Sequence, residues 1–212
     1  MEKKLVIWFL GGSSVGKTTQ AQNIHNYLST FAPGEREIVK WKAVDDRHEQ
    51  KKLCYTLMNG LSANLGEFGE TACGGTDTLG SKFQIQHSFD AALFRRQVVI
   101  IEGIMATAQW LHFLKRKHVV LWTVLLDVSE EVNFSRLRSR RGAKLGIDPS
   151  QVEIALKTKE NLAGKLRGFR SMYAKVAPES DFSTSIDTTD LNALRVKQLL
   201  IDDLEAILAQ SF

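Results

Sequence analysis

The segment Gly11-Gly-Ser-Ser-Val-Gly16-Lys17-Thr18 has the spacing G-x-x-x-x-G-K-[ST]. Glycines at these positions let the backbone wrap closely around phosphate groups and aim its N–H groups at them. The lysine then reaches the β- and γ-phosphates, and the threonine hydroxyl is a ligand for Mg²⁺. The sequence therefore predicts a site for ATP and magnesium. The residues expected to contact the nucleotide are Gly11, Gly12, Ser13, Ser14, Val15, Gly16, Lys17, Thr18 and Thr19.

Carboxylates follow two of the predicted strands. Glu102 comes directly after Val98–Ile101, and Asp46 follows the strand expected over 37–44. In open α/β sheets, ligands bind outside the carboxyl ends of the strands. We expect Glu102 to join Thr18 in holding magnesium, through water, or to accept a proton from a hydroxyl acceptor. Asp46 is a second candidate base, and helix capping or ion pairing is the alternative role for both carboxylates.

Arginines are densest in Arg136-Leu-Arg138-Ser-Arg140-Arg141, which precedes a glycine-containing segment. Arginines in a closing lid stabilise the charge that spreads over transferring phosphoryl oxygens. Arg136 and Arg140 share one helical face by their i,i+4 spacing, so we expect both in the site. The lid is predicted over about 136–150. A solvated helix face is the alternative interpretation.

A loop rich in Gly, Thr, Asp and Ser lies before the helix expected over Ser81–Arg96. Its residues Asp77 and Thr78, together with Lys82, are candidates for hydrogen bonds to the base or sugar of an acceptor. Arg47 is a candidate for an acceptor phosphate. An ordinary surface loop and an ordinary ion pair are equally consistent with these residues.

Hydrophobic periodicity predicts the elements that position these side chains. Leu5–Leu10 is a continuous apolar run, the pattern of a strand that is buried on both faces. The other strands are expected over Glu37–Val44, Val98–Ile101, His118–Leu126 and Phe182–Ile186. Helices are expected over Lys17–Ser29, Arg47–Leu61, Ser81–Arg96, Thr107–Lys117, Glu130–Ser139, Ser150–Val176 and Leu191–Leu208. This alternation predicts an α/β P-loop NTPase fold, a five-stranded mainly parallel sheet with helices on both faces, in one domain spanning 1–212.

The composition is that of an ordinary globular protein, with 43% hydrophobic and 25% charged residues. A net charge of +4 is modest, and it neither requires nor excludes a partner such as duplex DNA. Cys54 and Cys73 form no metal-binding pattern and are expected as reduced thiols. No apolar run is long enough to span a membrane or act as a signal peptide, so we expect a cytoplasmic protein, in a host's cytoplasm if a phage encodes it.

Several segments resemble the thymidylate kinase family. The similarity lies in Gly16-Lys17-Thr18-Thr19-Gln20, in Leu125-Leu-Asp127-Val-Ser-Glu130 with its arginine-rich continuation, in Phe169-Arg170-Ser-Met-Tyr173 and in Ser185-Ile186-Asp187. The resemblance spans most of the chain. It implies an ATP-dependent kinase with a nucleotide-type acceptor, and it suggests a homodimer, since thymidylate kinases are commonly dimers.

The acceptor-binding motifs depart from that family. Thymidylate kinases carry Asp-Arg and an aromatic residue or histidine where this chain has Glu102-Gly103-Ile104, and the chain's own Asp-Arg-His begins at Asp46. Gly74-Gly75-Thr76 resembles the family's Gly-Gly-Thr but lies nearer the strand at 98–101. Phage kinases that phosphorylate 5-hydroxymethyluracil within DNA are a related subfamily, and they remain an alternative. A non-catalytic nucleotide-binding switch is a third interpretation.

Overall fold

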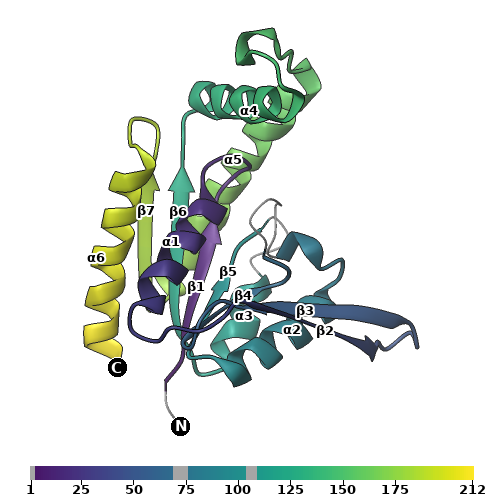
Figure 1. Cartoon of the computed structure of the whole chain (residues 1–212), viewed down its shortest axis with the longest axis vertical. Coiled ribbons are helices and arrows are strands. Elements are labelled where there is room, and N and C mark those ends of the chain that lie inside the picture. The colour runs from purple at the N-terminus through teal and green to yellow at the C-terminus, as the bar shows by residue number, and fades with distance from the viewer. Residues whose placement is uncertain (1–2, 69–75, 104–108) are drawn as a thin grey trace.

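A computed structural model describes residues 3–68, 76–103 and 109–212, and it contains a mixed sheet of seven strands (Figure 1). The order across the sheet is β2-β3-β4-β5-β1-β6-β7. The strands are β1 (Leu5–Leu10), β2 (Glu37–Val44), β3 (Gln50–Leu57), β4 (Ser62–Leu65), β5 (Val98–Ile101), β6 (Val120–Asp127) and β7 (Phe182–Asp187). From β4 to β7 all neighbours are parallel, whereas β2 and β3 extend the sheet in antiparallel fashion. The predicted five-stranded sheet is therefore two strands short.

Helices cover both faces of the sheet, as predicted. They are α1 (Lys17–Ser29), α2 (Lys82–Arg95), α3 (Gln109–Lys115), α4 (Glu130–Leu145), α5 (Leu156–Val176) and α6 (Ala193–Ser211). The apolar side chains of α1 and α6 pack in one core on one face, and those of α2, α3 and most of α5 pack in a second core on the other. The helix α4 lies across the top of the molecule in Figure 1, above the carboxyl ends of the central strands.

The central strand β1 explains the two cores. All six of its side chains are completely buried, and they alternate between the faces because successive strand residues point to opposite sides. Leu5, Ile7 and Phe9 belong to the core under α1 and α6, whereas Val6 and Trp8 belong to the core under α2 and α3. A continuous apolar run is thus the correct pattern for this strand, and it places the following glycine loop at the carboxyl edge of the sheet.

The helix predicted over Arg47–Leu61 is wrong, because the segment forms a turn and then the strand β3, and β4 begins directly after it. Asp45 closes the turn by accepting hydrogen bonds from the backbone N–H groups of Arg47 and Glu49 at 3.0 and 2.9 Å. β3 then pairs with β2 along its whole length, and α2 packs against it. Tertiary pairing therefore overrides the helix-compatible lysines and leucines of this segment.

The lid region differs in its boundaries from the prediction. The helix α4 continues six residues beyond the predicted end, to Leu145, and Gly146 caps it in the left-handed conformation at φ 67°. A 3-10 turn at Pro149–Gln151 follows, so α5 begins at Leu156 instead of Ser150. The helix is delayed because the backbone is extended after this turn, with Val152 at a ψ of 108°.

Two further expectations concern the cysteines and the membrane. Cys54 is a buried free thiol, and burial raises its pKa to about 11. Cys73 lies outside the described residues, as do Gly74, Gly75 and Ile104 and the first residues of the helix expected from Thr107. Among the helices that the structure describes, none combines the length and the apolar character needed to cross a bilayer.

Candidate active site

The glycine loop joins the buried strand β1 to the helix α1, at the carboxyl edge of the sheet. Gly11 and Gly16 have φ angles of 143° and 98°, which L side chains rarely adopt. A Cβ added to Gly11 would lie 2.5 Å from the carbonyl oxygen of Leu126 in β6. The loop must therefore carry glycine at this position, because the backbones of two neighbouring strands approach each other there.

Lys17 holds the loop in its closed curve. Its Nζ donates hydrogen bonds to the carbonyl oxygens of Gly11 and Gly12, both at 2.7 Å, and the residue is 8% exposed. The ammonium group therefore lies inside the loop, where the phosphates of a nucleotide would be bound. Ser14 adds a buried hydroxyl oxygen that has no hydrogen-bond partner among the described residues.

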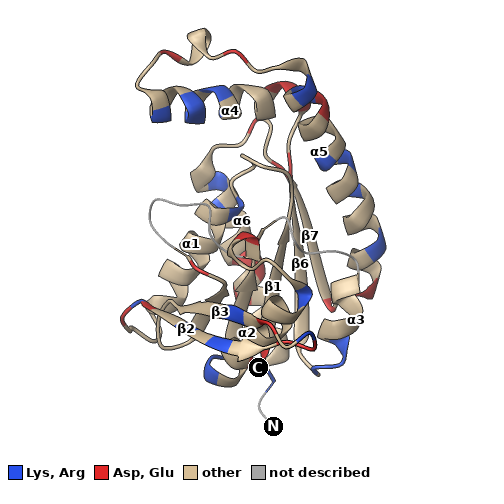
Figure 2. Ribbon diagram, turned by 90° about the vertical axis from the view of Figure 1, so that its right-hand side faces the viewer, with Lys and Arg blue, Asp and Glu red and all other residues tan. Residues whose placement is uncertain are grey.

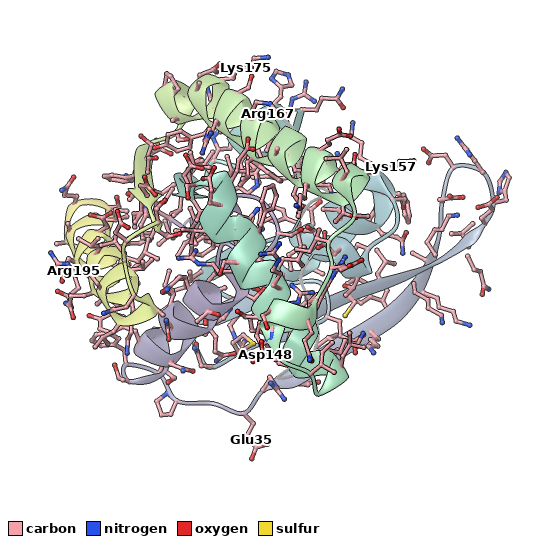
Figure 3. The ribbon with its side chains drawn as sticks, turned by 90° about the horizontal axis from the view of Figure 1, so that it is seen from above. Glu35, Asp148, Lys157, Arg167, Lys175 and Arg195 are labelled. Atoms are coloured by element: carbon pink, nitrogen blue, oxygen red, sulfur yellow. The ribbon has the colours of Figure 1, made fainter. Side chains whose placement is uncertain are left out.

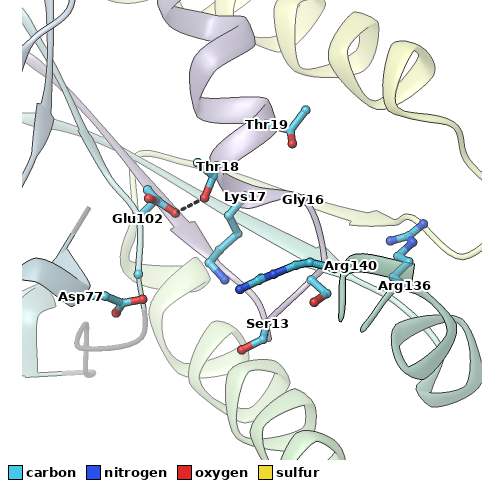
Figure 4. A pocket seen from close by; sticks show the side chains of 11 residues that line it. Ser13, Gly16, Lys17, Thr18, Thr19, Asp77, Glu102, Arg136 and Arg140 are labelled. Atoms are coloured by element: carbon cyan, nitrogen blue, oxygen red, sulfur yellow. Dashed lines mark hydrogen bonds between the residues drawn. The ribbon is translucent and has the colours of Figure 1, made fainter. Parts of the chain in front are cut away.

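Glu102 lies beside the loop at the end of β5, the strand next to β1 (Figure 4). Its Oε2 accepts a hydrogen bond from the Thr18 hydroxyl at 3.1 Å, whereas Oε1 is buried without a hydrogen-bond partner among the described residues. Burial raises the pKa of this carboxyl, and the Lys17 charge and the Thr18 hydrogen bond oppose that shift. A buried carboxylate with one unpaired oxygen is incompletely satisfied without a ligand.

The short segment Thr76–Thr78 packs against the end of β5. The backbone N–H and the hydroxyl of Thr76 both donate to the carbonyl oxygen of Glu102, at 2.8 and 3.0 Å. This contact explains Gly103, because a Cβ there would lie 2.2 Å from the Thr76 hydroxyl oxygen. Asp77 is consequently presented to the same space as Glu102 (Figure 4).

Basic residues gather along α4, above the carboxyl ends of the strands (Figure 2). Arg136 and Arg140 line the pocket beside Lys17, whereas Arg138 and Arg141 are exposed and do not line it. Arg136 is fixed by hydrogen bonds from its guanidinium to the hydroxyl and carbonyl oxygens of Thr188, at 2.8 and 2.5 Å. The i,i+4 pair expected from the sequence therefore lies on the pocket side of the helix.

Together these residues enclose a pocket of about 500 Å³. It is lined by Ser13, Ser14, Gly16, Lys17, Thr18, Thr19, Asp77, Glu102, Gly103, Arg136 and Arg140. Arginine and lysine side chains, glycine-loop amides and a buried carboxylate beside a threonine hydroxyl are the groups that bind a triphosphate with its metal ion. Their convergence from three separate elements makes this pocket the candidate active site.

Four residues expected near the acceptor do not line this pocket. Asp46 and Arg47 lie in the exposed turn between β2 and β3, because β2 ends in a hairpin and not at the carboxyl edge of the parallel strands. Thr78 instead accepts a hydrogen bond from the backbone N–H of Glu67 at 2.9 Å, and Lys82 is exposed at the start of α2. Asp46 is therefore replaced by Asp77 as the second carboxylate of the site.

Sequence reasoning missed the support of α4. Arg170 of α5 donates from Nε to Asp127 Oδ2 at 2.7 Å and from Nη2 to the carbonyl oxygen of Val128 at 3.1 Å. Thr188, which holds Arg136, itself donates to the carbonyl oxygen of Asp127 at 2.9 Å. The signal was present in Asp127 at the end of a predicted strand, but its partners are distant in sequence.

Comparison with known proteins shows similarity in structure. No protein-family model and no curated protein sequence matches the chain. The crystal structure of a fungal RNA kinase aligns over 100% of this chain and 90% of its own, with a TM-score of 0.51 and 13% identity. A presumed kinase from Chloroflexus aurantiacus aligns over 97% of this chain and 98% of its own, with a TM-score of 0.48 and 14% identity. At 13% identity, the similarity to the fungal RNA kinase shows a shared fold and nothing about activity.

Proposed function

We propose that this protein is a kinase that transfers the γ-phosphoryl group of ATP to a nucleoside- or nucleotide-type acceptor. The observation that carries the proposal is the convergence of Lys17, Glu102 and Arg140 on one pocket at the glycine loop. Phosphoryl transfer depends mainly on positioning and on neutralising charge, and this pocket supplies cations from both the loop and α4. The name of the fungal structural neighbour, an RNA kinase, agrees with this proposal.

Magnesium would enter with the nucleotide. Among the described residues, no cluster of three His, Cys, Asp or Glu side chains could hold a metal ion. Mg²⁺ commonly binds through one or two protein groups plus the phosphates of the substrate. The Thr18 hydroxyl and Glu102 Oε2, which meet at 3.1 Å, fit that role, and the ion would neutralise charge on the β- and γ-phosphates.

The state of Glu102 favours a hydroxyl acceptor. A phosphate acceptor already carries a charged oxygen, whereas a hydroxyl benefits from a base near its proton. Glu102 has an unpaired buried Oε1 and a raised pKa, which suit a carboxylate that accepts such a proton. In this reaction the hydroxyl oxygen bonds to the γ-phosphorus, the bond to the β–γ bridging oxygen breaks, ADP leaves, and the hydroxyl proton passes to Glu102.

A second candidate is phosphorylation of the hydroxymethyl group of 5-hydroxymethyluracil in DNA. Glu102-Gly103 stands where the thymidylate kinases that this sequence resembles carry Asp-Arg, and that substitution favours a different acceptor. The structural neighbour described as an RNA kinase also agrees with a nucleic-acid acceptor. A non-catalytic switch is disfavoured by Arg136 and Arg140, because a pocket that only binds nucleotide needs fewer cations at the transferring phosphate.

The test is an assay with γ-labelled ATP and magnesium. Free deoxynucleosides and their monophosphates form one set of acceptors, and duplex DNA carrying thymine or 5-hydroxymethyluracil forms another. Label in a small nucleotide supports the first candidate, and label only in modified DNA supports the second. If ATP binds but neither set of acceptors yields a labelled product, the kinase proposal is rejected and the non-catalytic nucleotide-binding switch is retained.

A further inference from the structure

A second pocket of about 490 Å³ adjoins the candidate active site and shares Thr18 and Thr19 with it. Its other lining residues are Gln22, Asn23, Asn26, Arg36 and Phe68. Amide side chains, one guanidinium and one aromatic edge line this space, and none of its described lining residues is acidic. We call it the amide pocket. Its wall chemistry suits an anionic ligand that carries hydrogen-bonding groups.

Two residues that line the amide pocket, Asn23 and Phe68, are held by hydrogen bonds to residues outside the pocket. The Asn23 side chain donates to Gln20 Oε1 at 3.0 Å, and Gln20 in turn donates to the carbonyl oxygen of Ala193 at 3.2 Å. On the other side, the backbone N–H of Phe68 donates to the Thr56 hydroxyl at 3.0 Å. Asn23 and Phe68 are therefore anchored to the body of the protein, whereas Thr19, Asn26 and Arg36 lie exposed at the rim of the pocket, where a ligand from solvent can reach them.

The hairpin formed by β2 and β3 carries a row of lysines on the same face. Lys40 pairs with Cys54, and Lys42 pairs directly with Lys52, so all three lysines point to one side of the hairpin. They are exposed, and this side also carries Thr56, the residue that anchors Phe68. We call Lys40, Lys42 and Lys52 the lysine row.

The opposite side of the hairpin is packed. Trp41 contacts Tyr55 edge to face, with ring centroids 5.6 Å apart, and both belong to the core under α2. The lysine row therefore lies on the α1 side of the sheet, where the amide pocket opens. It leads from Arg36, just before β2, outward along the hairpin that projects from the body (Figure 1).

The lysine row is electrostatically unfavourable without a partner. Like charges directly opposite each other on neighbouring strands are destabilising, and Lys42 faces Lys52. Neither forms an ion pair with a described residue, whereas Lys40 pairs with Glu67 at 2.7 Å. A row that repels itself on a projecting hairpin fits a partner that has regularly repeated negative charge.

We propose that the amide pocket and the lysine row form the binding site of a nucleic-acid strand whose hydroxyl group receives the phosphoryl group. This inference rests on the proposed function and deepens it by selecting a polynucleotide over a free nucleotide. A mononucleotide would occupy only the amide pocket with Arg36, whereas a strand continues along the hairpin and neutralises Lys42 and Lys52. The shared Thr18 and Thr19 place the acceptor end of this track next to the phosphate pocket.

Binding is measured with fluorescent oligonucleotides from one to twelve nucleotides long, single-stranded and duplex, across a salt series. The test variant is Lys42→Gln/Lys52→Gln. Its matched control is Lys157→Gln/Lys175→Gln, which removes the same charge from α5, a helix that packs against β6 and α4 (both lysines are labelled in Figure 3). ATP affinity is measured in every variant as the control for folding.

We expect affinity to rise with oligonucleotide length in the wild type and in the control. The test variant should bind the longer oligonucleotides about tenfold or more weakly, and its salt slope should fall by about 1.4, since each neutralised phosphate of a single strand contributes about 0.7. Equal loss in both double variants, or no dependence on length in the wild type, overturns the inference. If ATP is bound and a free nucleotide is labelled but oligonucleotides are not bound, the kinase stands and the nucleic-acid track is rejected.

Discussion

Thr18 and Glu102 lie 84 positions apart in the sequence and meet at 3.1 Å, with the threonine hydroxyl donating to Glu102 Oε2. Thr18 lies in the first turn of the helix after the glycine loop, and Glu102 directly follows the strand next to β1. The contact therefore joins the two elements that a parallel α/β sheet brings together at its carboxyl edge. It places a buried carboxylate beside the hydroxyl that the loop motif assigns to magnesium.

Replacing Glu102 by Gln should lower kcat by about a hundredfold or more, because it removes the negative charge and keeps the shape. Since burial raises the pKa of Glu102, activity that needs its ionised form should fall as pH drops through a value above the ordinary carboxyl range. The measurement is the pH dependence of kcat/KM with a hydroxyl acceptor. This fall of kcat/KM at low pH should be absent in Glu102→Gln. If both proteins show the same fall, it comes from another group, and Asp77→Asn is the next variant to test.

Replacing Lys17 by Ala should reduce phosphoryl transfer by at least about a thousandfold, because the ammonium inside the glycine loop is lost. Circular dichroism and the melting temperature should show a folded protein. Lys82→Ala is the control, since Lys82 is exposed and does not line the pocket. Activity near the wild-type level in Lys17→Ala contradicts the assignment of this loop.

The arginines of α4 provide a matched pair. Both Arg138 and Arg140 are exposed, but only Arg140 lines the pocket beside Lys17. Arg140→Ala should lower kcat by about a hundredfold or more, with a smaller change in the KM for ATP, because a cation at the transferring phosphoryl group acts mainly in the transition state. Arg138→Ala should stay within about twofold of the wild type. Equal effects would mean that the charge of α4 acts only from a distance.

The sequence predicted the parallel core well, because its strands are continuous apolar runs that follow one another with helices between them. Leu5–Leu10 and Lys17–Ser29 have their predicted bounds, and Phe182–Asp187 is one residue longer than expected. The segment after Arg47 failed because the second half of β3 and all of β4 are buried on both faces, so their residues show no strand-like alternation. Strand pairing with β2 and burial under α2 decide that conformation, and neither can be read from local periodicity.

The residues of the candidate site were likewise predicted correctly where local sequence decides their position, and incorrectly where the fold decides it. Residues that belong to a local motif or end a buried strand, such as Lys17, Thr18 and Glu102, were predicted and lie together. Asp46 was misplaced because its position depended on the direction of β2, which runs into an antiparallel hairpin. The amide pocket escaped prediction because it combines one face of α1 with Arg36 and Phe68, which only the fold brings together.

Glycines offer a prediction about stability. Gly11→Ala should destabilise the protein by several kcal/mol, about 3 or more, because its φ of 143° and the Leu126 carbonyl oxygen at 2.5 Å both exclude a Cβ. Gly164→Ala in α5 is the control: it is exposed, a Cβ there meets nothing within 4 Å, and it should stabilise by about 0.5–1 kcal/mol. Urea denaturation measures both variants. Similar stability in both would contradict the close approach of the loop to β6.

His25 makes stability depend on pH, and its position in the core determines the sign of that dependence. The ring is buried between α1 and β4, with Nδ1 2.8 Å from Ser62 Oγ and Nε2 3.5 Å from Asn64 Oδ1. Burial lowers its pKa from 6.5 to about 3, and the contact with Asn64 opposes that shift. Between these two values the unfolded chain binds a proton that the folded protein does not bind.

The contribution of His25 to stability should therefore be complete above pH 6.5 and should decline as the pH falls toward 3. The loss between pH 7.5 and pH 5 should be roughly 2 kcal/mol, since stability falls by about 1.4 kcal/mol for each pH unit below the pKa of the unfolded chain. Urea denaturation at pH 5, 6.5 and 7.5 measures it in the wild type and in His25→Gln, whose side chain does not titrate. His48→Gln is the control at an exposed histidine. If His25→Gln loses as much stability as the wild type over this range, the acid sensitivity belongs to other groups.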